Sequence, residues 1–260
     1  MLQLLHGILA DHQNGGLFTC FGIWHFCYII GAGLVIALLM ILLRKKETAV
    51  RMKTAGFFSD LAFGLYMADF FLMPLAYGEI DIEKLPFHIC TAMCLMCFLS
   101  RHVRFLEKYR IHFTLLGFLS NLVYLIYPAG VMWHRVSPFT YRVIQTLIFH
   151  AVMTVYGFLA LSYDPKGVSY KTCFRDLLVL VGMTLWAVLG NLCYNGAFEN
   201  YDHFFNWFFV MQDPFGLFDR SIAPFFMPVL NIALFFGVEL GLIGLFSQIR
   251  KRTAEPPKNG

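Results

Sequence analysis

Long apolar runs separated by short polar segments form the dominant pattern of this chain. Most of the runs approach the roughly 17 to 25 residues that cross a bilayer as a helix. We predict seven transmembrane helices at Phe21–Leu43, Thr54–Tyr77, Leu85–Leu99, Ile111–Tyr127, Thr140–Leu161, Cys173–Leu192 and Pro224–Phe246. The chain is therefore expected to be all-α, with one seven-helix membrane domain over residues 1–249 and a disordered tail over residues 250–260.

The composition agrees with this pattern, because 58% of the residues are hydrophobic and only 14% are charged. A soluble domain of this length needs far less apolar surface. The seven cysteines lie within or beside apolar runs, so we interpret them as reduced packing residues and not as a disulfide framework. Residues 1–16 lack the pattern of a cleaved signal peptide and are expected to lie on the membrane surface.

Basic residues divide unequally between the two sides of the predicted bundle. If the N-terminus is outside, the inner segments hold 16 of the 20 Lys and Arg residues, and the outer side keeps Lys84, Arg135, Arg142 and Arg220. Cytoplasmic loops retain Lys and Arg, so the pattern predicts an outer N-terminus and a cytoplasmic C-terminus. The net charge of +4 then faces anionic lipid, which favours membrane lipids over nucleic acid as partners.

The third predicted span, LPFHICTAMCLMCFL, contains a histidine, a threonine and three cysteines and is the main source of candidate reactive side chains. Pro86 suits the first turn of a helix. On that helix His88 and Thr91 share one face, and the cysteines at positions 90, 94 and 97 form a separate stripe. His88 is open to three interpretations: a reacting group, a ligand-holding group or a hydrogen-bonded part of the core. The cysteine stripe is also typical of ordinary packing.

Other polar side chains fall in the outer half or at mid-depth of the predicted spans. Such residues are costly in lipid and usually face the bundle interior or a watered cavity. Singly, each is also explained by hydrogen bonds between helices, whereas a carboxylate at mid-membrane needs a partner or a proton. The set comprises Asp69, Asn121, His150, Asn191, Asn195 and Glu239.

His88, Cys90 and His150 are candidate zinc ligands by residue type. Residues two apart on a regular helix point in different directions, so His88 and Cys90 reach one ion only if the helix is distorted. Phosphate-binding loops and a Gly-x-Ser-x-Gly elbow do not occur in the sequence. We therefore predict no metal and no cofactor.

The connection Tyr194–Ala223 is long for a compact bundle and mixes aromatic residues with Asn and Asp. It is too aromatic for a solvated linker and too polar to span a bilayer. We predict that it packs over the outer mouth of the bundle or dips into it.

Four segments resemble one family in order and content: LPFHICT, YRIHFTLLGFLSNLVYLIYP, FHAVMTVYGFLALSYDP and FFNWFFVMQDPFG. The family is the YwaF-like integral membrane proteins, a bacterial group similar to the animal transmembrane protein 164. The resemblance covers roughly residues 85–220 and rests on His88 with Thr91, on His150, and on Asn206 followed by Asp213-Pro214-Phe215. It implies a multi-pass protein of a bacterial plasma membrane in which His88 and His150 come together.

The animal relative is regarded as a phospholipid acyltransferase whose cysteine nucleophile directly precedes the first histidine. In this chain Phe87 occupies that position, and a cysteine follows at Cys90. A shift of three residues turns a side chain by about 300° around a helix, so Cys90 points in a different direction from a cysteine at position 87. The more distant androgen-induced-gene hydrolases pair a threonine with a histidine, which makes Thr91 the second candidate nucleophile.

Two hypotheses follow. The first is a lipid acyltransferase or lipid-ester hydrolase in which Cys90 or Thr91 attacks an ester and His150 or His88 is the general base. Amides of Asn121, Asn191, Asn195 or Asn206 are then candidates to stabilise the oxyanion, and Asp213 joins the substrate-binding set. The second is a non-catalytic transport or ligand-binding bundle in which Glu239 changes protonation.

Overall fold

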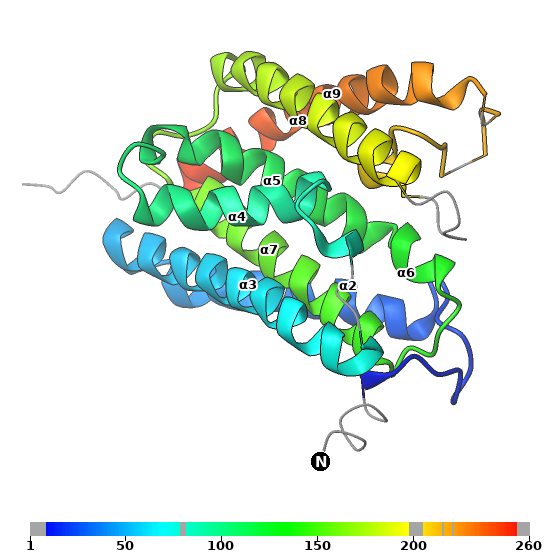
Figure 1. Cartoon of the computed structure of the whole chain (residues 1–260). Coiled ribbons are helices and arrows are strands. Elements are labelled where there is room, and N and C mark those ends of the chain that lie inside the picture. Colours follow the sequence, from blue (N-terminus) through cyan, green and yellow to red (C-terminus); the bar gives the residue numbers. More distant parts are fainter. Residues whose placement is uncertain (1–8, 79–81, 198–204, 215, 220, 254–260) are drawn as a thin grey trace, which may run out of the picture.

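The structure is a computed structural model that describes residues 9–78, 82–197, 205–214, 216–219 and 221–253. These residues form helices and loops, and no strand occurs among them, so the predicted all-α class is confirmed. The long helices in Figure 1 are α2 Ile23–Leu43, α3 Thr48–Tyr77, α4 Ile89–His102, α5 Arg110–Ile126, α7 Tyr141–Tyr163, α8 Tyr170–Ala197 and α9 Ala223–Thr253. The short elements are α6 Ala129–Trp133 and the 3-10 turns η1 Ile82–Lys84, η2 Glu107–Tyr109 and η3 Trp207–Phe209.

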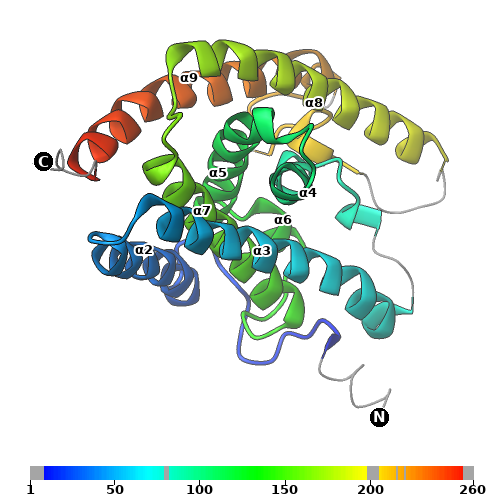
Figure 2. The same cartoon turned by 90° about the vertical axis from the view of Figure 1, so that its left-hand side faces the viewer.

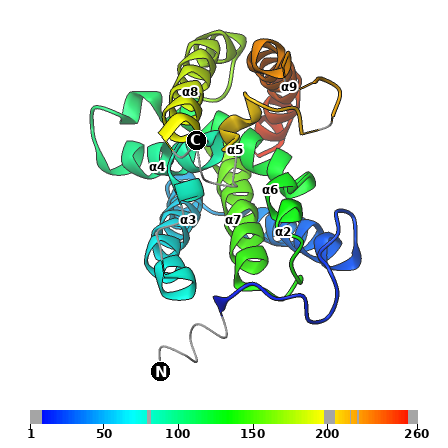
Figure 3. The same ribbon diagram turned by 45° about the vertical axis from the view of Figure 1, so that its right-hand side comes forward.

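Helix α7 forms the centre of the bundle. It packs against α2, α3 and α5 and is buried along most of its length. In Figure 2, α2 and α3 lie on one side of α7, α4 and α5 lie on the other, and α8 with α9 forms an outer layer. Figure 3 shows the same order from another side, with α8 and α9 far from α2 and α3.

Two glycines allow α5 to approach its neighbours closely. A Cβ atom at Gly157 of α7 would lie 2.5 Å from the Cβ of Phe118 on α5. A Cβ atom at Gly117 of α5 would lie 3.3 Å from the Sγ of Cys97 on α4. Small residues at helix crossings bring backbones together, which is how membrane helices gain packing energy without a hydrophobic effect between them.

Six helices are long and apolar enough to cross a membrane: α2, α3, α5 with its flanks, α7, α8 and α9. The remaining predicted span contains α4, which has 14 residues and is therefore about 21 Å long. A bilayer core is about 30 Å thick. Six of the seven predicted spans are thus supported, and α4 is too short to cross by itself.

Helix α4 also begins later than the sequence predicts. It starts at Ile89, and His88 precedes it in an extended conformation with φ −75° and ψ 140°. Pro86 is therefore not in the first turn of the helix, and that expectation was wrong. At the other end of the chain, α9 continues to Thr253. Residues 250–253 of the predicted disordered tail are helical, and residues 254–260 lie outside the described part.

Candidate active site

A cavity of about 250 Å³ lies at the end of the bundle where α6 is found. Its wall is built by α3, η1, the start of α4, the end of α5, α6, the first half of α7 and the loop around η3. Segments far apart in sequence therefore meet here. The predicted site residues that line the cavity are Asp69, His88, Cys90, Thr91, His150 and Asn206.

His150 is held by an amide on the neighbouring helix. Its Nδ1 lies 2.7 Å from Oδ1 of Asn121, whose Nδ2 donates a hydrogen bond of 2.7 Å to the carbonyl oxygen of Gly117. Because the amide nitrogen is engaged by a carbonyl, its oxygen faces the imidazole, so Nδ1 must be the donor. Neutral His150 therefore has its lone pair on Nε2. The ring of Tyr124 stacks on this imidazole at 3.9 Å between centroids.

His88 is held in the opposite tautomer by the loop around η3. The backbone N–H of Phe208 donates to its Nδ1 at 3.1 Å. A peptide N–H can only donate, so Nδ1 of His88 is an acceptor and the proton of the neutral ring lies on Nε2. One cavity thus contains one imidazole whose Nε2 is an acceptor and a second whose Nε2 is a donor.

Cys90 and Thr91 lie in the first turn of α4 and are nearly completely buried, with 8% and 9% of their surfaces exposed. The Thr91 hydroxyl donates to the carbonyl oxygen of His88 at 3.0 Å, which leaves its lone pairs available. Both side chains line the cavity together with the two imidazoles. The start of α4 therefore brings a thiol and a hydroxyl to the cavity as candidate nucleophiles.

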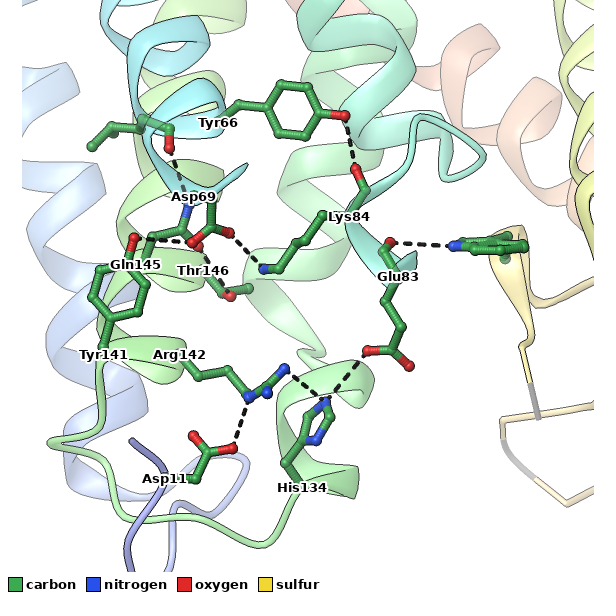
Figure 4. A network of polar contacts seen from close by, with 12 residues as sticks. Asp11, Tyr66, Asp69, Glu83, Lys84, His134, Tyr141, Arg142, Gln145 and Thr146 are labelled. Carbon is green, nitrogen blue, oxygen red and sulfur yellow. Dashed lines mark hydrogen bonds and ion pairs between the residues drawn. The ribbon is translucent and has the colours of Figure 1, made fainter. Parts of the chain in front are cut away.

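We call the part of the cavity wall that carries charged and histidine side chains near α3, η1 and α6 the mouth; it comprises Asp69, Glu83, Lys84, His134 and Arg142. One part of the mouth is an ion pair between α3 and η1, shown in Figure 4. The Asp69 carboxylate accepts a contact of 2.8 Å from Nζ of Lys84 and a hydrogen bond of 2.9 Å from the Tyr141 hydroxyl. Asp69 is 1% exposed. The Tyr66 hydroxyl donates to the carbonyl oxygen of Lys84 at 2.8 Å. A buried carboxylate is thus neutralised beside the cavity.

A second part of the mouth connects α7, α6 and the N-terminal segment. Nε of Arg142 lies 3.0 Å from the Asp11 carboxylate, and Nε2 of His134 lies 3.6 Å from the Glu83 carboxylate. Figure 4 shows Arg142 and His134 side by side. Nη1 of Arg142 lies 3.5 Å from Nε2 of His134. Lys84 and Arg142 are thus two cations of the mouth, each paired with a carboxylate.

Sequence reasoning missed many of the polar and aromatic side chains of the wall. A signal was available for two of them, because Lys84 and Arg142 belong to the four basic residues that the charge distribution leaves outside. Such exceptions indicate sites where a cation has a specific partner. The missed lining residues include Tyr66, Glu83, Lys84, Tyr124, His134, Arg142, Gln145 and Thr146.

The asparagines of α8 bind the loop instead of lining the cavity. Asn191 accepts from the N–H of Trp207 at 2.9 Å and donates to its carbonyl oxygen at 3.0 Å. Asn195 makes the same pair of bonds with Phe205, at 2.8 and 2.9 Å. The predicted packing of this loop over the bundle is thus seen for its described residues. Residues 198–204 of the predicted segment lie outside them.

Asn206 and Asp213 shape the same loop internally. Oδ1 of Asn206 accepts from the N–H groups of Met211 and Gln212, both at 3.0 Å. The Asp213 carboxylate accepts from the N–H of Phe218 at 3.0 Å. Both side chains are engaged by backbone, although Asn206 also reaches the cavity wall.

Glu239 lies elsewhere. It is completely buried in α9 and does not line this cavity. In the described part of the chain, no group of three or more His, Cys, Asp or Glu side chains is arranged to hold a metal ion.

Comparison with known proteins adds the family. Searches of curated proteins and of solved structures give no significant match. The model of the TMEM164 family matches residues 20–245, a range that contains every segment on which the resemblance was based. The six long apolar helices agree with a multi-pass membrane protein. Since the match covers most of its length, the chain belongs to the TMEM164 family.

Proposed function

We propose that this protein is a membrane-embedded lipid acyltransferase or lipid-ester hydrolase. The observation that carries the proposal is the cavity in which two imidazoles of opposite tautomer share a wall with a thiol and a hydroxyl. Acyl transfer needs a base that takes a proton from the nucleophile and a donor that stabilises the oxyanion. His150 and His88 supply these two functions separately.

The proposed reaction has two half-steps. Nε2 of His150 takes the proton of Cys90 or Thr91, whose sulfur or oxygen attacks the carbonyl carbon of a lipid ester. The tetrahedral intermediate collapses with cleavage of the ester C–O bond, and the leaving alcohol takes the proton from His150. Water or a second lipid alcohol then attacks the acyl-enzyme, gives its proton to His150 and carries the acyl group away as the nucleophile regains its proton.

The proposed donors to the oxyanion of each intermediate come from His88 and from the start of α4. Nε2–H of His88 is one, because its Nδ1 is occupied by the Phe208 N–H. The first N–H groups of α4 are further donors, since a helix offers no internal acceptor to its first turn. In this proposal His88 is a donor and not the base.

The size and charge of the cavity support a lipid substrate. At about 250 Å³ it is smaller than the roughly 300–1,000 Å³ pockets that enclose a whole drug-sized ligand. It accommodates the reacting ester with part of a headgroup, while the acyl chains remain between helices in the bilayer. The cations and carboxylates at the mouth suit a charged headgroup. The charge distribution supports an extracytoplasmic position of this mouth in a bacterial plasma membrane.

The test is acyl exchange in proteoliposomes that contain mixed phospholipids with one isotope-labelled acyl chain. We expect the wild type to release or move the label and His150→Gln to abolish this. Cys90→Ala and Thr91→Val identify the nucleophile, because only one of them should remove the activity. Cys94→Ala is the matched control, since this thiol is fully buried one turn further along α4 and does not line the cavity.

An unchanged lipid profile with the folded wild-type protein contradicts the proposal and favours the binding or transport hypothesis. Activity that survives in both Cys90→Ala and Thr91→Val but not in His150→Gln contradicts the covalent step alone. In that case the histidine activates water directly.

A further inference from the structure

A second group of buried polar side chains lies at the opposite end of the bundle from the cavity. His112 is near the start of α5 and Asp176 is near the start of α8, whereas the cavity contacts only the last turns of α5. Nδ1 of His112 and Oδ1 of Asp176 are 2.5 Å apart, and 7% and 0% of these residues are exposed. The second carboxylate oxygen of Asp176 is buried and has no hydrogen-bond partner within the part of the chain that the structure describes.

Glu239 of α9 belongs to this group. It is 0% exposed, and neither of its carboxylate oxygens has a hydrogen-bond partner among the described residues. Asp176 and the thiol of Cys173 are buried on α8, the helix that packs against α9. The surrounding side chains are apolar, with Leu115, Phe118, Leu161, Ile243 and Phe246 forming one cluster with Cys173.

No neighbouring cation balances a charge on Glu239 in the described part of the chain. On α8, Lys171 and Arg175 are exposed and therefore point away from the bundle. On α9, the guanidinium of Arg250 donates to the carbonyl oxygens of Phe246 and Val168. The buried ionisable groups on the helices packed against α9 are Cys173 and Asp176 of α8 and His112 of α5, which contacts Asp176. Helix α7 contributes the apolar residues Phe158 and Leu161 to the cluster beside α9.

Burial of a carboxylate without a partner costs several kcal/mol, which protonation avoids. A second carboxylate beside it increases that cost. We propose that Glu239 holds a proton at neutral pH and that Glu239, Asp176 and His112 form a proton-binding site separate from the outer cavity. Among the described residues, these side chains do not belong to a group that is arranged to hold a metal ion.

The site couples helix packing to protonation. Loss of the proton leaves two buried carboxylates on the neighbouring helices α8 and α9, in apolar surroundings where their repulsion is poorly screened. Uptake of the proton removes this repulsion. The inference does not depend on the proposed acyl transfer, because none of the three residues lines the cavity.

Infrared spectroscopy of the full-length protein in bilayers tests the proposal. A protonated carboxyl in an apolar site gives a carbonyl stretching band separate from those of amides and carboxylates. We expect this band at neutral pH in the wild type, its loss in Glu239→Gln, and a shift of the band in D₂O because the proton exchanges. Asp69→Asn is the matched control and should leave the band unchanged, since that carboxylate is paired with Lys84.

Absence of the band in the folded wild type, or its persistence in Glu239→Gln, overturns the proposal. A band that does not shift after equilibration in D₂O overturns the exchange of the proton.

Asp176→Asn gives a second measurement that does not require replacement of Glu239. Removal of the neighbouring negative charge favours the ionised form, so the band should disappear at a lower pH than in the wild type. If sodium or potassium ions raise the thermal midpoint of the wild type but not that of Glu239→Gln, the site binds a cation and the proposal is wrong.

Discussion

Replacement of Asn121 by leucine tests whether the orientation of His150 matters for the proposed chemistry. Leucine fills a similar space but accepts no hydrogen bond. The Nδ1–H of His150 then loses the acceptor that lies 2.7 Å away, in a place where Asn121 and His150 are 0% and 3% exposed. A buried N–H group left without an acceptor costs about 1–3 kcal/mol.

The imidazole avoids this cost by rotating or by moving its proton to Nε2. Either change removes the lone pair that the proposed base needs, so the cost appears in the barrier to proton transfer. Because about 1.4 kcal/mol corresponds to a tenfold change in rate, we expect acyl transfer to fall about 5- to 150-fold.

The assay is the initial rate of acyl exchange in proteoliposomes at several pH values, with the thermal midpoint measured on the same samples. Ser120→Ala is the matched control. Its hydroxyl donates to the same Gly117 carbonyl at 3.3 Å but does not contact His150. A wild-type rate and pH profile in folded Asn121→Leu refutes the reasoning.

Three further predictions concern stability and the mouth. Gly157→Leu should lower the free energy of unfolding by about 1–3 kcal/mol, because the new side chain overpacks against α5. Gly182→Leu is the control and should change the thermal midpoint little, since the space around its Cβ position is open. Equal effects of the two substitutions contradict the close approach of α5 and α7. Lys84→Met should destabilise the protein by up to about 3 kcal/mol, because it leaves the buried carboxylate of Asp69 without its cation. Addition of Asp69→Asn to the same chain should restore the thermal midpoint. Failure of this rescue argues against the ion pair. Asn191→Ala should increase proteolysis of the loop around η3 and lower the thermal midpoint, and an unchanged cleavage pattern contradicts its role as a clamp.

Hydropathy predicted the positions of most helices, because a transmembrane span needs a long apolar run and such runs make up most of this chain. The start of α4 was not readable. Pro86 permits a helix, but the backbone at His88 is extended and its ring is bound by a peptide N–H from a loop 120 residues away. Local preference carries no information about such a distant contact.

Two histidines could be predicted as site residues, but their tautomers could not. Each tautomer depends on which partner reaches Nδ1, an amide oxygen in one case and a backbone N–H in the other. The asparagines show the same limit. Asn121 and Asn191 both lie in the outer half of predicted spans, yet one orients an imidazole and the other binds a loop backbone.

The His112–Asp176 pair escaped sequence reasoning because both residues lie near basic segments at the ends of predicted spans. A polar residue in that position usually contacts water or headgroups. Only the packing of α8 and α9 over α5 reveals that these two side chains are buried.

The short length of α4 makes the geometry of the proposed acyl transfer dependent on the bilayer. If its C-terminal end is at one interface, its first turn lies about 9 Å below the opposite surface of a hydrocarbon core about 30 Å thick. Ester groups of lipids lie near that surface, so a substrate must sink or the membrane must thin locally before the thiol or hydroxyl reaches it. Lipids with shorter chains should therefore react faster in their own bilayers than longer homologues, and equal rates in both would place the nucleophile at the interface.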